Sequence, residues 1–190
     1  SGASGTARNV WVIDPLDGTH NYLRGFPHFC TSIALLESGQ PTLGVIYDPL
    51  RDELFTADRG NGAFLNDRRL RVAGRRELSA SVVCCGIPHA GRGDPVQFRS
   101  ELAAVQSKVA GVRRTGSAAL DLAWVAAGRF DGFWERALSP WDLAAGMLLV
   151  REAGGLVTDL DGGTDVLTKG SVLAGNEYIH ASLLSAIKSA

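Results

Sequence analysis

The feature that most constrains this chain is a short apolar run that turn-forming residues interrupt. Residues 10–13 (Val-Trp-Val-Ile) are β-branched or aromatic and predict a buried β-strand. Residues 14–19 (Asp-Pro-Leu-Asp-Gly-Thr) follow at once. Pro15 and Gly18 predict that the strand ends at the first aspartate and that a turn with free backbone N–H groups begins near Thr19. We therefore expect carboxylates and backbone donors to share one corner.

The carboxylates at this corner are those of Asp14 and Asp17, and a distant Asp142 would join them. Mg²⁺ favours oxygen ligands and takes one or two carboxylates from protein, with water and substrate phosphate completing its shell. Two such ions held roughly 3.5–4 Å apart serve in-line displacement at phosphorus. The pattern therefore indicates phosphoester hydrolysis. The Asp-Pro pair taken alone fits an ordinary structural turn equally well.

Residues 14–19, taken together with Glu135 and residues 141–146 (Trp-Asp-Leu-Ala-Ala-Gly), resemble the inositol monophosphatase family of magnesium-dependent phosphatases. The resemblance is greatest to the bacterial extragenic suppressor type and runs from about Val10 to the C-terminus. Further matching segments are residues 44–49, 53–57, 62–66, 114–121 and 152–155. The resemblance implies an α/β (α+β) protein with the layered α-β-α-β-α sandwich of the inositol monophosphatase and fructose-1,6-bisphosphatase sugar-phosphatase fold, here without its N-terminal helices.

The resemblance also implies a metal role for four matching residues. Asp14 would be shared between two magnesium ions, and the carbonyl of Leu16 would bind the first of them. Asp17 and Asp142 would bind the second ion. Two or three Mg²⁺ ions are implied in total, and a metal-activated water would displace the alcohol without a covalent intermediate.

The remaining residues that match the family would bind phosphate and substrate. Gly18 and Thr19 would hold the phosphate through backbone N–H groups, as helix N-termini hold anions. The hydroxyl of Thr19 would help to orient the attacking water, which makes it catalytic together with Asp14 and Asp17. Glu135 would accept hydrogen bonds from substrate hydroxyls. The other residues implied to line the substrate pocket are Gly116, Ser117, Ala118 and Asp142.

One part of the family pattern is not found in these residues. Family members carry a Gly-Glu-Glu segment shortly before the Asp-Pro-Leu-Asp motif, and one of its glutamates binds the first metal. The chain starts at Ser1, too late to include that segment. We therefore expect a fragment or processed product whose metal site is incomplete by itself. A second departure is His20, where relatives often have threonine, and we expect it to face solvent because no partner for it is evident.

Composition favours a globular enzyme. With 190 residues, 45% of them hydrophobic, one domain can bury a sizeable core. A net charge of −1 argues against general affinity for nucleic acid or membranes, and no apolar stretch approaches a membrane span. Three cysteines offer neither a paired disulfide framework nor zinc-type spacing. We expect a cytoplasmic protein.

Strand and helix signals alternate along the chain. A boundary at residue 86 would divide it into a metal-motif and β-meander subdomain, 1–86, and a C-terminal α/β subdomain, 87–190, of one phosphatase domain. The predicted strands are 29–36, 42–47, 53–57, 63–65 and 80–85. The predicted helices are 96–109, one following Gly116, one from Asp142 to Gly154, and 176–190.

Several features are assigned no site role. Five arginines between positions 68 and 76 predict a solvated hairpin, because no aromatic residues interleave them. The histidines at 28, 89 and 180 lack metal-ligand spacing. The four tryptophans predict core packing. Asp121 and Asp131 are left out of the acidic site, because a helix and a turn account for them.

The favoured function is Mg²⁺-dependent hydrolysis of a phosphate monoester, namely inositol monophosphate to inositol and phosphate. Lithium sensitivity and a homodimer are implied by the family resemblance, and the substrate would be a small phosphorylated polyol. One alternative is another substrate: fructose bisphosphate, histidinol phosphate or a nucleotide 3′-phosphate. The other is a non-catalytic, regulatory partner of a transcription complex, since suppressor-type relatives are implicated in such complexes.

Overall fold

The computed structural model describes residues 8–89 and 91–190. Its first sheet is an antiparallel meander in which each strand pairs with the next along the chain. The strands of this sheet are β1 (Asn9–Asp17), β2 (Cys30–Glu37), β3 (Gln40–Asp48), β4 (Glu53–Asp58), β5 (Gly62–Leu65) and β6 (Arg68–Arg69). Tight turns make this arrangement possible, for example the Ser38–Gly39 turn, where both residues have positive φ.

The second sheet is mixed and has the strand order β10-β11-β9-β7-β8. Its central strand β9 pairs parallel with β7 and antiparallel with β11. The strands are β7 (Val82–Cys85), β8 (Gly111–Arg113), β9 (Gly132–Glu135), β10 (Leu156–Thr158) and β11 (Val172–Gly175). Parallel pairs need crossover connections, and α2 and α3 supply them.

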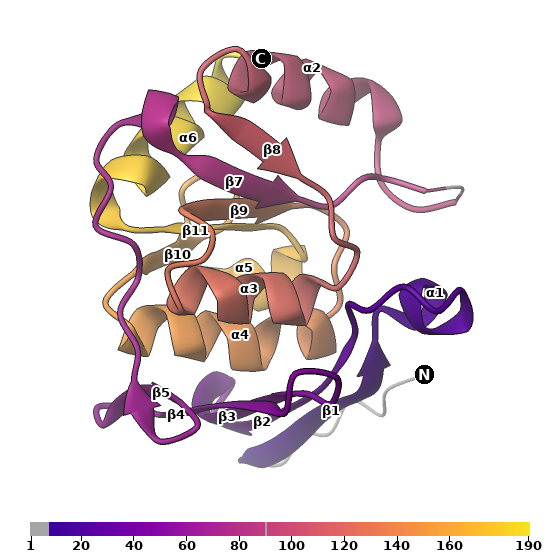
Figure 1. The fold of residues 1–190 in the computed structure, drawn as a ribbon, viewed down its shortest axis with the longest axis vertical. Coiled ribbons are helices and arrows are strands. Elements are labelled where there is room, and N and C mark those ends of the chain that lie inside the picture. The colour runs from indigo at the N-terminus through magenta and orange to yellow at the C-terminus, as the bar shows by residue number, and fades with distance from the viewer. Residues whose placement is uncertain (1–7, 90) are drawn as a thin grey trace.

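Two helices lie between the sheets, and two others cover the far face of the second sheet (Figure 1). The inner pair is α3 with α4, and the outer pair is α2 with α6. The helices are α1 (Thr19–Leu23), α2 (Pro95–Gln106), α3 (Ala118–Ala126), α4 (Pro140–Glu152), α5 (Val166–Lys169) and α6 (Glu177–Lys188), with a 3-10 turn at Leu78–Ala80. This order of layers confirms the predicted sandwich. The structure describes its β-α-β-α part.

The main core lies around α3 and α4. Nearly every side chain of α3 is buried, and nine consecutive residues of α4 are buried as well. Glycines allow close approach here, because a Cβ on Gly146 would lie 2.5 Å from Leu122 and one on Gly44 would lie 3.1 Å from the backbone of Ala145. The packing fixes the start of α4, and hence Asp142, against the first sheet.

Strand β1 differs from the prediction in two ways. It continues through Pro15 to Asp17, with a register shift between Asp14 and Asp17. An edge strand tolerates proline because one side of it makes no ladder hydrogen bonds. The prediction that this run is buried was wrong, since Trp11 is 60% exposed and Ile13 is 53% exposed. Hydrophobic sequence alone does not reveal that a strand lies at a sheet edge with one face open.

Other predicted elements are confirmed with small changes. The helix predicted at 96–109 is α2 and ends at Gln106, and the helix predicted from Asp142 begins at Pro140. The five arginines of the hairpin region are exposed, as expected. The division at residue 86 stays a prediction, although the chain passes from one sheet to the other earlier, between Arg69 and Val82. No described helix is long and apolar enough to cross a membrane.

Candidate metal centre and substrate pocket

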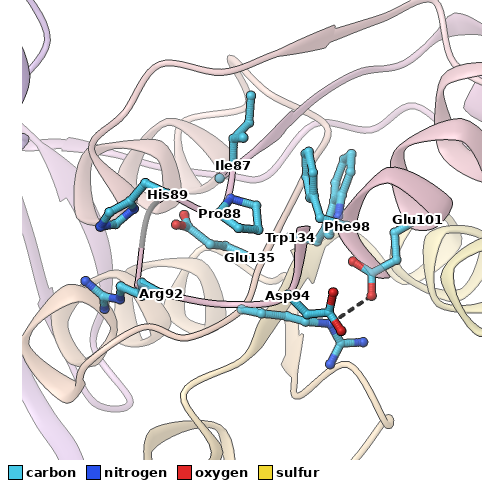
Figure 2. Close-up of a pocket in the computed structure, with 11 residues that line it drawn as sticks. Ile87, Pro88, His89, Arg92, Asp94, Phe98, Glu101, Trp134 and Glu135 are labelled. Atoms are coloured by element: carbon cyan, nitrogen blue, oxygen red, sulfur yellow. Dashed lines mark hydrogen bonds and ion pairs between the residues drawn. The ribbon is translucent and has the colours of Figure 1, made fainter. Parts of the chain in front are cut away.

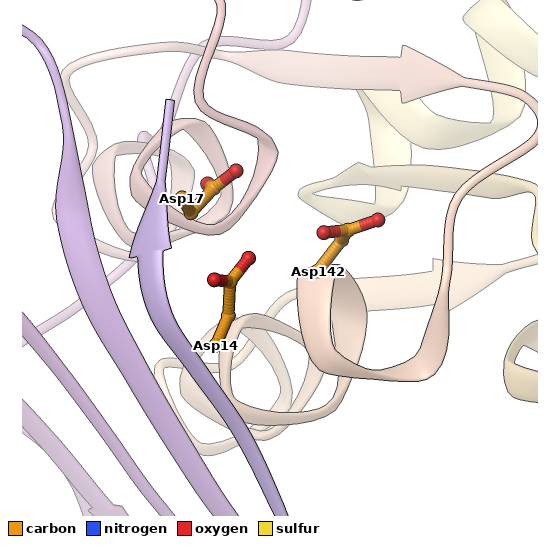
Figure 3. Close-up of side chains that lie close together, drawn as sticks. All are labelled: Asp14, Asp17 and Asp142. Atoms are coloured by element: carbon orange, nitrogen blue, oxygen red, sulfur yellow. The ribbon is translucent and has the colours of Figure 1, made fainter. Parts of the chain in front are cut away.

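Three aspartates converge where β1 ends beside the start of α4. One carboxylate oxygen from each of Asp14, Asp17 and Asp142 lies within 4.8 Å of the others. Figure 3 shows the three side chains, two from β1 and one from the first turn of α4, around a common space. The sequence predicted this set of metal ligands, and 125 positions separate Asp17 from Asp142, so only the fold brings them together.

The irregular end of β1 orients Asp14. Its Oδ1 accepts a hydrogen bond from the backbone N–H of Leu16 at 3.0 Å. The carbonyl of Leu16, the fourth predicted ligand, accepts from the Thr19 hydroxyl at 2.9 Å. Burial raises the pKa of Asp14, the Leu16 N–H opposes this, and the nearby charge of Asp142 adds to it. Thr19 is therefore in direct contact with a predicted ligand group.

Asp17 is held by the start of α3. Its Oδ2 accepts from the Ser117 hydroxyl at 2.6 Å and from the backbone N–H of Ala119 at 2.9 Å. Burial raises the pKa of Asp17 to about 7 despite these two bonds, with smaller contributions from Asp142 and Asp14. The charged groups that act on Asp17, the carboxylates of Asp142 and Asp14, are both negative, so a positive charge beside Asp17 would be favourable.

Asp142 occupies the third helical position of α4 and forms a capping box with Ser139. Its Oδ2 accepts from the backbone N–H of Ser139 at 2.8 Å. The same oxygen lies 3.3 Å from Nη2 of Arg92. A helix N-terminus favours a carboxylate at this position, which fixes the side chain toward the other two aspartates.

Gly18 shapes the turn that was predicted to hold phosphate. Its φ is +83°, and a Cβ there would lie 2.9 Å from the carbonyl oxygen of His28. Only glycine fits this position, because both the left-handed backbone and the close contact exclude a side chain. Thr19 begins the five-residue helix α1, and His20 is exposed, as expected. All three residues line the main cavity.

Glu135 faces the cavity from the end of β9. Burial raises its pKa to about 8, with further contributions from Asp121, Asp17 and Asp142 that the opposite charge of Arg92 partly offsets. No hydrogen bond joins its carboxylate to another described residue. Space for it exists because residue 86 is glycine: a Cβ there would fall 1.8–2.2 Å from the Glu135 carboxyl atoms.

The main cavity has a volume of about 700 Å³, which suits a small phosphorylated metabolite. It brings together most of the predicted site, and the predicted site residues among its lining are Asp14, Leu16, Asp17, Gly18, Thr19, Gly116, Ala118, Glu135 and Asp142. Ser117 was predicted to bind substrate, but it is 1% exposed and its hydroxyl is bonded to Asp17. It contacts a predicted ligand rather than the open cavity.

Two polar residues that line the cavity, Asp121 and Asn21, were not predicted from the sequence. Asp121, which was left out, lines the cavity, is 1% exposed and bonds Nε2 of His28 at 3.0 Å, Sγ of Cys84 at 3.3 Å and the Thr115 hydroxyl. Asn21 donates to the carbonyls of His28 and Thr115 at 2.6 and 2.8 Å. The signal for Asp121 was a lone acid in the apolar helix α3. Asp131 instead pairs with Arg75, outside the site.

A smaller cavity of about 40 Å³ adjoins the main one (Figure 2). The two share Glu135 and the loop between β7 and α2, including His89 and Arg92. Deeper in, Glu101 is 2% exposed and pairs with Arg136 at 2.8 Å. Its second oxygen and the indole N–H of Trp134 have no partner among the described residues. The pairing of Glu101 with Arg136 was not predicted, because Glu101 lies within helix α2 and no local pattern marks it as buried.

The three carboxylates fit a divalent cation. All donors in the set are oxygens, which hard cations prefer. Burial and mutual repulsion raise the pKa of Asp14 and of Asp17, so a positive ion between them would relieve an unfavourable arrangement of charge. The backbone N–H of Ser139 donates to Oδ2 of Asp142, so Oδ1 of Asp142 is available to a cation.

Comparisons with known proteins agree with this geometry. Residues 1–190 match the model of the inositol monophosphatase family. An inositol-1-monophosphatase from Mesorhizobium japonicum is 62% identical over 182 residues, covering 96% of this chain and 68% of that protein. The Nus factor SuhB of Xylella fastidiosa is 55% identical over 161 residues, covering 85% of this chain and 58% of that protein. The crystal structure of the extragenic suppressor protein suhB from Bartonella henselae has a TM-score of 0.93 at 53% identity, covering 96% of this chain and 71% of that one.

Proposed function

The chain belongs to the inositol monophosphatase family, and we propose that the protein hydrolyses phosphate monoesters with the help of divalent cations, Mg²⁺ foremost. The observation that carries the proposal is the convergence of Asp14, Asp17 and Asp142 within 4.8 Å at the wall of a cavity of about 700 Å³. Such a cluster of partly buried carboxylates favours cations and, through them, phosphate.

Four groups would hold the cations: the carboxylates of Asp14, Asp17 and Asp142, and the carbonyl of Leu16. When bound, the ions would polarise the phosphoryl oxygens, acidify a water and stabilise the leaving oxygen. The sequence expectation of two or three ions is part of this proposal. Ser117 and Ala119 would keep Asp17 oriented toward the ions through the bonds at 2.6 and 2.9 Å.

The protein groups divide the remaining tasks. Backbone N–H groups at Gly18 and Thr19 would bind the phosphate, because the first N–H groups of a helix have no partner within the helix. The Thr19 hydroxyl lies 2.9 Å from the Leu16 carbonyl, where it can orient a water beside the cation ligands. Glu135, which also lines the cavity, would accept hydrogen bonds from hydroxyls of the leaving alcohol.

Inositol monophosphate is the substrate that we favour. The Glu135 carboxylate makes no hydrogen bond to another described residue, so it is available to a vicinal diol of a ring polyol. The relative from Mesorhizobium japonicum is named for this substrate, which supports the choice. Fructose bisphosphate, histidinol phosphate and nucleotide 3′-phosphates remain the alternatives to compare.

The direct test is phosphate release by the purified full-length protein. We expect release from inositol 1-phosphate with Mg²⁺, none with EDTA, and recovery when Mg²⁺ is returned. A panel containing the three alternative substrates would rank kcat/KM. Absence of phosphate release from every member of the panel, from protein shown to be folded, would contradict the proposal. We also expect inhibition by lithium, a homodimer and a cytoplasmic location.

A regulatory role in a transcription complex is the second candidate. It is favoured by the relative named Nus factor SuhB. The exposed arginines at 68, 69, 71, 75 and 76 would form its contact surface. Co-purification with the transcription machinery that survives Asp14→Asn and is lost when these arginines are neutralised would support this role. The reverse pattern would rule it out.

A further inference from the structure

Arg92 reaches from the loop between β7 and α2 into the candidate metal centre. Its Nη2 lies 3.3 Å from Oδ2 of Asp142, and its Nε donates to the carbonyl of Ala137. Arg92 lines both cavities, and Figure 2 shows it on the same side as His89 and Glu135. One side chain therefore touches a predicted metal ligand and borders the space for substrate.

The backbone around Arg92 is held on both sides. Its N–H donates to the carbonyl of His89 at 2.9 Å, which closes a turn before it. Two residues later, the Asp94 side chain accepts from the N–H groups of Val96 and Gln97 at 2.8 and 3.1 Å and caps α2. The position of the guanidinium therefore depends mainly on its own side-chain torsions.

Arg92 also contacts the segment from Glu135 to Asp142 at two points, the carbonyl of Ala137 and the carboxylate of Asp142. Ala137, between them, has φ +60°, a left-handed backbone that is unfavourable for a residue with a side chain. The bond from Arg92 to its carbonyl helps to hold this turn. Arg92 thus helps to hold the turn that connects Glu135 to Asp142.

The pairing of Arg92 with Asp142 conflicts with a cation on the same carboxylate. Arginine stays protonated, so its charge and that of a divalent ion repel each other. Asp142 can release the guanidinium without losing its neutral partner, because the Ser139 N–H still donates at 2.8 Å. The Arg92 side chain is 41% exposed, which gives it room to turn. Its planar fork suits phosphoryl oxygens.

We propose that Arg92 is a substrate-positioning residue that exchanges partners, pairing with Asp142 in the cation-free site and with a phosphoryl oxygen of the substrate once a divalent cation occupies that carboxylate. The inference rests on the proposed phosphatase function and adds a residue to it. Arg92 would make the site bind cations less tightly on their own and phosphate more tightly in their presence.

Arg92→Gln separates these effects, because it removes the charge and keeps a donor of similar reach for Ala137. Titration calorimetry of the full-length protein with Mg²⁺ alone should give cation binding on the order of fivefold tighter than in the unsubstituted protein. Inorganic phosphate, titrated with Mg²⁺ present, should bind on the order of tenfold more weakly. Arg92→Lys keeps the charge and should leave cation affinity nearly unchanged.

Arg99→Gln is the matched control, since Arg99 is exposed on neighbouring α2 and the same charge is removed. It should change neither affinity. Unchanged or weaker cation binding in Arg92→Gln with an unaltered melting temperature would overturn the proposal, as would the same change in Arg99→Gln. If the unsubstituted protein binds no divalent cation at all, the proposed function fails instead.

Discussion

The two sides of the main cavity are built differently. On one side, Asp14, Asp17 and Asp142 each accept a hydrogen bond from a backbone N–H, so the backbone fixes all three carboxylates. On the other side, the Glu135 carboxylate bonds to no other described residue and lies in space left by Gly86. The fold therefore sets the positions of the three aspartates in advance, whereas the position of Glu135 depends on the space around it and on the ligand that enters the cavity.

Among substitutions on the aspartate side, we expect Asp14→Asn to have the largest effect on activity. The substitution keeps the shape of the side chain but removes a charge from the cation site, so we expect kcat to fall by about 10³-fold or more. Phosphate release at saturating Mg²⁺ measures this. Asp58→Asn changes an exposed aspartate of β4 and should be without effect. Full activity in Asp14→Asn would refute the metal assignment.

Glu135→Gln tests the other side with a smaller expected effect. Losing a carboxylate acceptor for hydroxyls should lower kcat/KM for inositol 1-phosphate by roughly 10-fold or somewhat more, mainly through KM. Hydrolysis of p-nitrophenyl phosphate, which offers no hydroxyl to Glu135, should change little. Equal losses on both substrates would place Glu135 in the chemical step and contradict the division into two sides.

Gly86→Ala tests whether substrate binding on the glutamate side requires the open space beside the Glu135 carboxylate. An added Cβ would meet the Glu135 carboxyl at 1.8–2.2 Å, so the side chain must move. We expect KM for inositol 1-phosphate to rise about fivefold with cation affinity unchanged. Gly74→Ala is the control, because a Cβ there meets nothing within 4 Å. A loss of cation affinity in Gly86→Ala would show that the two sides are not separable.

The smallest effect concerns pH. Without cations, burial raises the pKa of Asp17 from 3.8 to about 7, so the folded protein keeps a proton that the unfolded chain has released. The free energy of unfolding contributed by Asp17 should therefore fall as pH rises from about 4 to 7. We expect the melting temperature to drop by a few degrees over this range, less so in Asp17→Asn. Added Mg²⁺ should restore it at pH 8, and a wild-type slope in Asp17→Asn would contradict the assignment.

Sequence reasoning found the aspartate side and only part of the glutamate side, for a physical reason. Asp142 lies at a helix start that the structure retains, and Asp14 and Asp17 lie in a predicted strand that the structure retains, although β1 ends at Asp17 and not at Asp14. Arg92 lies in a loop without such a signal. Asp121 gains its contacts from His28, 93 positions away. Contacts of this kind depend on tertiary packing, which local patterns do not encode.

The fold was predictable to a similar degree. The helical spacing behind α2 and the glycines after α4 indicated helices that the structure contains. The run around Trp11 and Ile13 misled, because its residues alternate between the two faces of an edge strand and one of these faces is open in the described structure. A hydrophobic run predicts a strand, but its place in the sheet decides which side chains are buried.

Anomalous scattering from crystals of the full-length protein soaked in Mn²⁺ would locate the cations directly. We predict peaks in contact with the carboxylates of Asp14, Asp17 and Asp142, and their loss in crystals of Asp14→Asn. Peaks confined to other surface carboxylates, or the same peaks in Asp14→Asn, would contradict the assignment of these three aspartates as cation ligands.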